Sequence, residues 1–219
     1  MPVSHSTVAI QGFGNVGLHT AQFLYEAGLK VVAVSDINTA LYHPAGINIP
    51  ELILYYNLNG KSITGYPKAE AIEHDELLLL PLNVLIPAAK EDVITAANAP
   101  YIKASLIVEG ANGPVASDAD TILKDKNITV VPDIVANAGG VTVSYFEWLQ
   151  NSLHESWPIE QVNNRLNDIL EKSFSDVYAT AIQYDVTLRV AAYILAVKKV
   201  AQTHLLNKSV LNAHSYIQN

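Results

Sequence analysis

The chain has 219 residues and a formal net charge of −8, with 21 acidic residues, 13 basic residues and no cysteine. The lack of cysteine excludes a disulfide framework, a thiolate zinc site, an iron–sulfur cluster and a cysteine nucleophile. The acidic balance argues against nucleic-acid binding, which needs clustered lysine and arginine. The longest apolar stretch, residues 77–89, is interrupted by Pro81 and Pro87 and is too short to span a bilayer. Residues 1–6 lack the pattern of a secretory signal, so we expect a soluble cytoplasmic protein.

The chain alternates predicted strands and helices up to Pro132. Residues 7–11 form a β-branched run that predicts a buried strand ending at Gly12. Apolar residues and alanines at helical spacing predict a helix over 15–26, closed by Gly28. Further apolar runs predict more strands, and helical patterns lie between the later ones. The strands are expected at 30–34, 84–86, 106–108 and 129–131, and the helices at 91–99 and 116–126.

Near-continuous apolar strands alternating with helices indicate an α/β fold with a doubly wound, mostly parallel sheet of the Rossmann type. After Pro132 the pattern is helical only. We expect a single dinucleotide-binding domain over 1–219, with a βα core, C-terminal helices and a polar tail that frays. Their expected bounds are 1–136 for the core, 137–206 for the helices (at 138–153, 159–184 and 188–205) and 207–219 for the tail.

The strongest motif is a glycine-rich turn between the first strand and the first helix. It reads Gly12-Phe13-Gly14-Asn15-Val16-Gly17. In a GxGxxG turn, the first glycine permits a tight bend, the second lets the backbone approach a pyrophosphate, and the third lets helix and strand pack closely. The phosphates would meet free N–H groups at the helix start. A purely structural turn and a methyltransferase loop that binds S-adenosylmethionine are the alternatives.

Asp36 lies at the end of the second predicted strand, 19 residues after Gly17. A carboxylate in this place can bridge the hydroxyls of an adenosine ribose and would repel a 2′-phosphate. Asp36 therefore favours NAD, although a nearby lysine or backbone N–H could offset the repulsion and allow NADP. Alternatively, Asp36 caps the turn that follows it.

Three further clusters of small and turn-forming residues fall at the carboxyl ends of predicted strands, where open α/β sheets bind ligands. They are residues 87–89, 109–114 and 137–141. Asn112 and Asn137 offer amide groups that could pair with a carboxamide, although asparagine and glycine are also ordinary turn residues. The seven histidines show no metal-ligand spacing, so we expect no metal site.

The segments IQGFGNVG, VVAVSD, VLIPAA, VEGANGP and NAGGVTVSYFEWLQN resemble the cofactor-binding domain of glutamate dehydrogenases, within the glutamate/leucine/phenylalanine/valine dehydrogenase family. The resemblance extends from about residue 7 to 205. Asn83 and Lys90 stand where it leads us to expect an acid and an apolar residue. It implies pyrophosphate binding by Gly12, Phe13, Gly14, Asn15, Val16 and Gly17, adenosine contacts from Asp36, Ile37, Ala88 and Ala89, nicotinamide contacts from Ala111, Asn112 and Asn137, and substrate contacts from Val141 and Ser144.

The resemblance also implies the reaction: oxidative deamination of an amino acid, with glutamate favoured, to a 2-oxo acid and ammonia with NAD or NADP. Relatives of this kind carry their catalytic lysine and aspartate in an N-terminal domain. Here the first strand begins near residue 7, so we expect that domain to be absent. The chain then has no catalytic residue of its own and binds cofactor with little or no turnover.

Two partner expectations follow. A separate chain could supply the substrate domain, and the chain could self-associate through the exposed cleft side, formed by the helix after NAGG and the last helix. The alternative function is a stand-alone dinucleotide-binding regulatory or sensor module without catalysis. A partner or upstream sequence with the missing lysine and aspartate motifs would favour the enzyme.

Overall fold

The computed structural model describes residues 6–217, with side chains described up to residue 205. The chain divides into two compact units, Met1–Ala138 and Gly139–Asn219. Within residues 6–217, no helix combines the length and the apolar character needed to cross a membrane.

The first unit is built on a seven-stranded sheet with the order β4-β3-β2-β1-β5-β6-β7. The sequence prediction of a doubly wound, mostly parallel sheet is confirmed, because the order reverses direction at β1 and five strands run parallel. Crevices at such reversal points are where open α/β sheets bind ligands. The parallel strands are β1 (Thr7–Gln11), β2 (Lys30–Ser35), β5 (Val84–Pro87), β6 (Leu106–Val108) and β7 (Thr129–Val131).

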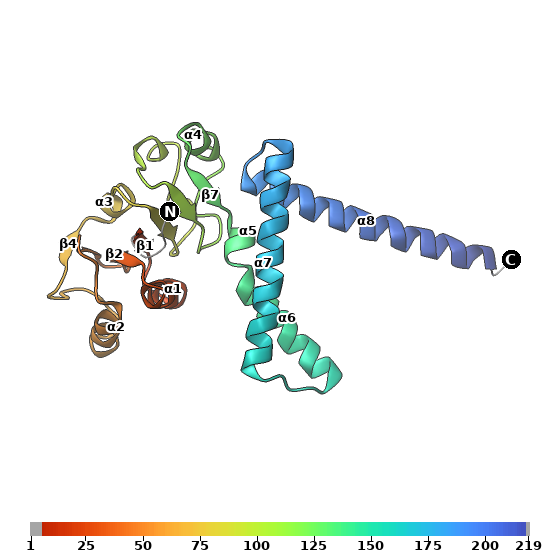
Figure 1. The fold of residues 1–219 in the computed structure, drawn as a ribbon, viewed down its shortest axis with the longest axis horizontal. Helices are drawn as coiled ribbons and strands as arrows, with labels where there is room; N and C mark the ends of the chain where they lie inside the picture. Colours follow the sequence, from red (N-terminus) through yellow and green to blue (C-terminus); the bar gives the residue numbers. More distant parts are fainter. Residues whose placement is uncertain (1–5, 218–219) are drawn as a thin grey trace. The chain divides into compact units, whose positions relative to one another are not determined.

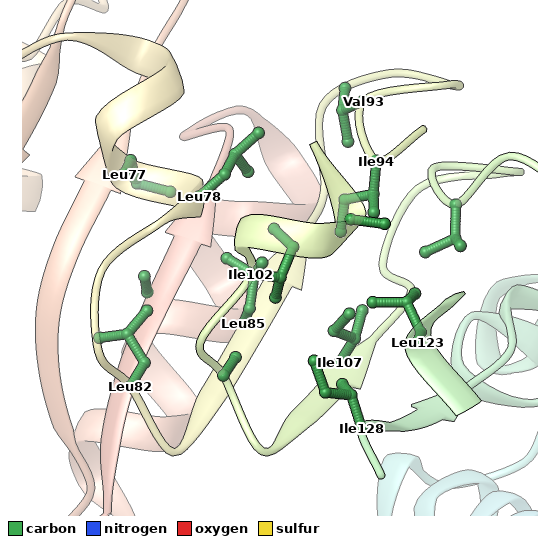
Figure 2. Packing of buried hydrophobic residues seen from close by; sticks show 14 of the residues in the cluster. Leu77, Leu78, Leu82, Leu85, Val93, Ile94, Ile102, Ile107, Leu123 and Ile128 are labelled. Carbon is green, nitrogen blue, oxygen red and sulfur yellow. The ribbon is translucent and has the colours of Figure 1, made fainter. Parts of the chain in front are cut away.

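The strands are buried on both faces, and successive side chains enter different cores. Val8 and Ile10 of β1 belong to one buried cluster, whereas Ala9 between them belongs to the other. Helices α1 (Asn15–Glu26) and α2 (Ile49–Leu58) contribute to the first cluster. Helices α3 (His74–Leu78) and α4 (Asp120–Asp125) contribute to the second. Figure 1 shows these helices around the sheet, and Figure 2 shows the second core, where leucines of α3 and α4 pack over β5 and β6.

The end of α1 shows why the first βα unit could be read from the sequence. Gly28 adopts φ +84°, a left-handed conformation that glycine takes without strain. Its N–H donates to the Tyr25 carbonyl and the Leu29 N–H donates to the Leu24 carbonyl, which is the Schellman pattern of helix termination. The predicted helix 15–26 and its closure by Gly28 are confirmed.

The predicted helix over 91–99 is wrong. The β-branched pair Val93 and Ile94 is buried instead, and Ile94 pairs with Val115 in an isolated parallel bridge. The N–H of Ile94 donates to the Pro114 carbonyl, and the N–H of Ala116 donates back to the Ile94 carbonyl. Only a short 3-10 helix, Ala99–Tyr101, forms nearby. Because the same pairing occupies residues 115–116, the predicted helix 116–126 shrinks to α4.

An unpredicted segment lies between β2 and β5. The strands β3 (Ala40–Tyr42) and β4 (Glu70–Ile72) extend the sheet in antiparallel fashion at one edge. Helix α2 lies between them, and the Asn48 side chain caps it by accepting from the Glu51 N–H at 3.2 Å. Helix α3 then leads into β5. This segment contributes to both the sheet edge and the candidate site.

The second unit is helical, as predicted. The short helix α5 (Asp133–Ala136) precedes it, and its helices are α6 (Ala138–Leu153), α7 (Ile159–Tyr184) and α8 (Leu188–Ile217). Asp185 ends α7 in a left-handed conformation. The expected tail after residue 206 is wrong as secondary structure, because α8 continues as helix to Ile217.

Candidate functional site

A cleft of about 590 Å³ opens at the carboxyl ends of β1, β2 and β5. Three strand-end turns line it, together with side chains from the segment between β2 and β5. The cleft contains seven of the residues predicted from the sequence as cofactor contacts: Gly12, Phe13, Gly14, Asp36, Ile37, Ala88 and Ala89. Its other lining residues are Gln11, Ser35, Tyr56, Lys61, His74 and Lys90.

The glycines of the first turn differ in what surrounds them. Gly12 adopts φ +104°, and a Cβ added there would lie 3.0 Å from the Ala89 Cβ. A Cβ on Gly17 would lie 1.8 Å from the Gly12 carbonyl oxygen, so helix α1 packs directly on the turn. A Cβ on Gly14 would meet nothing within 4 Å. Gly12 and Gly17 therefore serve the fold, whereas Gly14 leaves open space at the helix start.

Helix α1 begins beside that space without a side-chain cap, because its N-cap is Gly14. Asn15, Val16 and Gly17 form its first turn, where backbone N–H groups have no partner within the helix. These three residues do not line the cleft itself. Their expected contribution is therefore the backbone at the helix end rather than their side chains.

Phe13 serves mainly the core. Its side chain is 1% exposed and packs edge to face against Tyr56, with ring centroids 5.4 Å apart. This contact ties the glycine turn to α2. Ile37, in contrast, is 92% exposed at the end of β2 and offers an apolar surface at the cleft.

Asp36 accepts four hydrogen bonds from its own chain. One carboxylate oxygen accepts from the N–H groups of Asn38 at 2.7 Å and Thr39 at 2.9 Å. The other accepts from the Ser62 hydroxyl at 3.0 Å and the Ile63 N–H at 2.9 Å. Partial burial raises the pKa of Asp36, but these hydrogen bonds outweigh it and hold the pKa below its ordinary value. The turn-capping alternative is thus observed, and Asp36 also anchors the loop that follows α2.

Three cleft residues with basic side chains were not predicted as site residues. Lys61 follows α2, His74 begins α3, and Lys90 follows β5. The His74 Nε2 donates to the Asp36 carbonyl oxygen at 2.9 Å. Lys61 and His74 were missed because they belong to the segment for which no elements were predicted. Lys90 had a signal, since it stands where the family resemblance leads us to expect an apolar residue.

A second cluster joins the turn after β6 to Asn137, the residue that follows α5. The Asn137 side-chain amide donates to the Asn112 side-chain oxygen at 2.7 Å and approaches the Ala111 carbonyl at 3.4 Å. The structure therefore brings together the three residues predicted at the nicotinamide end. They do not line the 590 Å³ cleft.

Two buried or half-buried carboxylates hold this cluster in place. Glu109 is fully buried and accepts from the N–H groups of Val115 at 3.2 Å and Asp133 at 2.7 Å. The Asp133 carboxylate accepts from the Gly113 N–H at 2.8 Å. In the sequence, Glu109 stands out only as part of the cluster at residues 109–114. Its apolar neighbours gave no sign that it would be buried and hydrogen-bonded to the backbone.

Val141 and Ser144 lie on α6 in the second unit and are both exposed. Their spacing of three residues puts them on one helix face. Tyr145 and Trp148 stack beside them with ring centroids 5.8 Å apart, both more than half exposed. Because this helix belongs to the second unit, a relation between Val141 or Ser144 and the cleft stays a prediction. Among the residues that the structure describes, no group of three or more histidines and acids could hold a metal ion.

A cleft at the reversal point of a doubly wound sheet, bounded by a GxGxxG turn, is typical of dinucleotide-binding α/β folds. The family model of the Glutamate/Leucine/Phenylalanine/Valine dehydrogenases matches residues 1–207. The chain belongs to this family.

Its similarity to named proteins points to one branch. It is 51% identical over 197 residues to a glutamate dehydrogenase of Thermotoga maritima. The matched region covers 90% of this chain and 47% of the relative. It is 45% identical over 203 residues to an NAD-specific glutamate dehydrogenase A of Halobacterium salinarum, covering 93% and 46%. The crystal structure of the hetero-hexameric glutamate dehydrogenase of Thermus thermophilus superposes with a TM-score of 0.87 at 28% identity, covering 94% and 49%. The chain spans about half the length of these proteins.

Proposed function

We infer that this chain is the nicotinamide-dinucleotide-binding half of an amino-acid dehydrogenase that acts on glutamate. The cleft at the carboxyl ends of β1, β2 and β5 is the observation that carries this function. Its glycine turn fits the cofactor because the space beside Gly14, which a side chain would fill, lies at an uncapped helix start. The family membership supports the reaction class.

The pyrophosphate would bind at the N-terminus of α1, where backbone N–H groups and the helix dipole favour an anion. The adenosine end would lie against Asp36, Ile37 and the alanines after β5. When bound, NAD or NADP supplies the carbon that accepts the hydride from the amino-acid Cα. The chain's own role in that step is to fix the position and orientation of the nicotinamide.

The amide pair Asn112 and Asn137 suits that role. The Asn137 amino group donates to the Asn112 oxygen, which leaves the Asn112 amino group as donor and the Asn137 oxygen as acceptor. A nicotinamide carboxamide has the complementary oxygen and amino group. A pair fixed by its own hydrogen bond, on a turn anchored by Glu109, loses little freedom when it binds.

Val141 and Ser144 would contact the amino acid. A serine hydroxyl can donate to the side-chain carboxylate of glutamate, and valine offers an apolar wall beside it. Both lie exposed on one face of α6.

The 219-residue chain would bind cofactor without appreciable turnover. Oxidative deamination needs a base, a group that activates water and a cation for the α-carboxylate. The acids next to the amide pair, Glu109 and Asp133, both accept backbone N–H groups and hold the turn. A substrate domain outside these 219 residues would supply the catalytic groups.

The test uses the purified 219-residue chain. Calorimetric titration with NADH and NADPH should show saturable binding of at least one cofactor, and L-glutamate with NAD or NADP should produce no increase at 340 nm. Turnover by the chain alone would contradict the proposal that these 219 residues lack the catalytic groups. Binding of neither cofactor would contradict the function. Binding that no substrate-domain chain converts into turnover would support a regulatory module instead.

Self-association is the remaining proposal, through exposed apolar residues of the second unit. On α8, Tyr193, Val197 and Val200 are each more than half exposed at helical spacing, and on α6 Val141 and Trp148 are similarly exposed. Apolar patches of this kind are commonly covered by a partner. Light scattering should show a dimer or larger species, and Val197→Glu should lower the mass. A monomer at high concentration would contradict the proposal.

A further inference from the structure

The chain contains two Asn-Gly dipeptides, Asn59–Gly60 and Asn112–Gly113, and their surroundings in the fold differ. Asn-Gly is the dipeptide most prone to deamidation, because glycine has no side chain to hinder the reaction and its backbone is freely adjustable. The glycine nitrogen loses its proton and bonds to the side-chain carbonyl carbon of the asparagine, and ammonia leaves. Water then opens the cyclic imide to aspartate or isoaspartate. The surroundings of the glycine N–H therefore influence how fast each dipeptide reacts.

The Gly113 N–H is bound to a carboxylate. It donates to the Asp133 Oδ2 at 2.8 Å. Removal of its proton would break a hydrogen bond to a charged acceptor, which is stronger than a neutral one. It would also place a nitrogen anion next to a negative charge, and like charges oppose ionisation. The Asp133 carboxylate thus disfavours the first step of deamidation at Asn112.

Other contacts fix the turn around Asn112. Its side-chain oxygen accepts from the Asn137 amide at 2.7 Å, which holds the carbonyl group that would be attacked. The Gly113 carbonyl accepts from the Asp92 N–H at 2.9 Å. The buried Glu109 carboxylate anchors the end of the same turn by accepting from a backbone N–H. Ring closure requires the side chain and the following peptide unit to rotate toward each other, and these contacts oppose that rotation.

The other dipeptide, at the end of α2, lacks such protection. Residues 59–61 are all exposed, and the Gly60 N–H has no hydrogen-bond acceptor in the part of the chain that the structure describes. A Cβ added to Gly60 would meet nothing within 4 Å, so the space around it is open. The Asn59 side chain donates to the carbonyls of Ser62 at 3.2 Å and Thr64 at 3.1 Å. These bonds join exposed groups, which open locally at low cost.

We propose that Asn59 is a site of spontaneous deamidation in the folded chain, and that Asp133 protects Asn112 from the same reaction. At position 112 the reaction would replace an amide donor of the proposed nicotinamide site by a carboxylate. Asp133 therefore preserves a group on which that site depends. The rates themselves do not depend on any cofactor, so they test this proposal separately from the proposed function.

Deamidation at position 59 changes the loop after α2. A carboxylate cannot donate to the Ser62 and Thr64 carbonyls, and isoaspartate also routes the main chain through the side-chain carbon. The same loop supplies the Ser62 hydroxyl and the Ile63 N–H to Asp36. The modified chain should therefore hold this loop less firmly than the newly purified chain.

The experiment measures both deamidation rates in the purified 219-residue chain. The chain is incubated in mildly alkaline buffer, folded and in urea, and mass spectrometry of its peptides follows asparagine, aspartate and isoaspartate at both positions. In the folded chain, Asn59 should react at least about tenfold faster than Asn112. In urea, the two rates should differ by less than about threefold, because unfolding removes the contacts that distinguish the dipeptides.

Three variants locate the cause of the difference. Asp133→Ala should raise the Asn112 rate at least about fivefold and leave the Asn59 rate unchanged. Asp133→Asn keeps one acceptor oxygen without the charge, so its Asn112 rate should lie between those of the wild type and Asp133→Ala. The matched control is Asp118→Ala, because the exposed Asp118 also accepts a backbone N–H, from Ala96 at 3.3 Å. It should change neither rate.

The outcomes that overturn the proposal are distinct. Equal rates at Asn59 and Asn112 in the folded wild-type chain would remove the evidence for selective protection. An Asn59 that reacts in urea and stays intact in the folded chain would refute the modification site. An equal acceleration at both positions in Asp133→Ala would reflect general loosening of the chain and would refute the protective role of Asp133.

Discussion

The glycine turn allows fold and binding to be separated by two single substitutions of the same kind. Gly17→Ala would put a methyl group 1.8 Å from the Gly12 carbonyl oxygen. Contacts below 3.0 Å essentially never occur for a Cβ, so α1 and the turn would have to part by about 1.2 Å. Overpacking of this kind against backbone costs about 3 kcal/mol or more. For a chain of this length, that loss lowers Tm by roughly 6–12 °C.

Gly14→Ala is the matched variant. Its backbone has φ −80°, which alanine adopts without strain, and the added methyl group meets nothing within 4 Å. Loss of a glycine N-cap to alanine costs at most about 1 kcal/mol, so Tm should change little. The methyl group would occupy the space beside the helix start, and cofactor affinity should fall at least about tenfold.

Both variants are measured by thermal unfolding under circular dichroism and by NADH titration. The expected pattern is a lowered Tm for Gly17→Ala and a lowered affinity at nearly unchanged Tm for Gly14→Ala. A wild-type Tm in Gly17→Ala would refute the argument from close packing. Wild-type affinity in a folded Gly14→Ala would refute the placement of the pyrophosphate.

Three further predictions concern the polar groups. Asp36→Asn should destabilise the chain by about 1–3 kcal/mol, because asparagine keeps one acceptor oxygen and its NH2 group cannot accept from the Ile63 N–H in place of the second oxygen. Since the pKa of Asp36 is lowered in the fold, urea titrations should show this difference fully at neutral pH and see it shrink below about pH 4. Asn137→Ala should weaken NADH binding about tenfold and leave ADP-ribose binding unchanged in calorimetry, because only NADH carries the carboxamide that would pair with the Asn112–Asn137 amides. Glu109→Ala should lower Tm more than Glu109→Gln in thermal unfolding, because glutamine keeps one acceptor oxygen for the buried N–H groups.

The elements predicted correctly from the sequence are those whose signal is local. The first βα unit combines a β-branched strand, helical spacing and a glycine at the left-handed position after the helix, and each signal predicts the same structure. Residues 91–99 show the opposite case. Their spacing suits a helix, but the burial of Val93 and Ile94 against Val115 depends on a segment about twenty residues away. No local pattern contains that contact.

The residues of the candidate site also differ in whether a local sequence pattern indicates them or a distant segment determines their contacts. Gly12, Gly14 and Asp36 were predicted because motif spacing defines them. Of the four donors that engage Asp36, the two in the turn after it correspond to the turn-capping alternative. The two from the loop after α2 were not predicted, because that loop lies 26 or 27 residues further along the chain. The prediction that Asp36 favours NAD allowed for a nearby lysine or backbone N–H that offsets the carboxylate, but the sequence alone did not show which groups lie there. The effect of the carboxylate on a bound ribose depends on groups that the fold brings to it.

The two ends of the proposed cofactor site are built from different chemistry, and this determines how each responds to its surroundings. At the β2 end, Asp36, Lys61 and Lys90 are charged and partly or fully exposed, so recognition there depends on ionic strength. At the β6 end, the pair Asn112 and Asn137 is neutral and is held by hydrogen bonds. Recognition by directed, uncharged groups changes little with salt. We therefore expect added salt to weaken the contacts that would hold the adenosine end and to leave intact the contacts that would orient the nicotinamide, so that the two ends of the site respond separately to ionic strength.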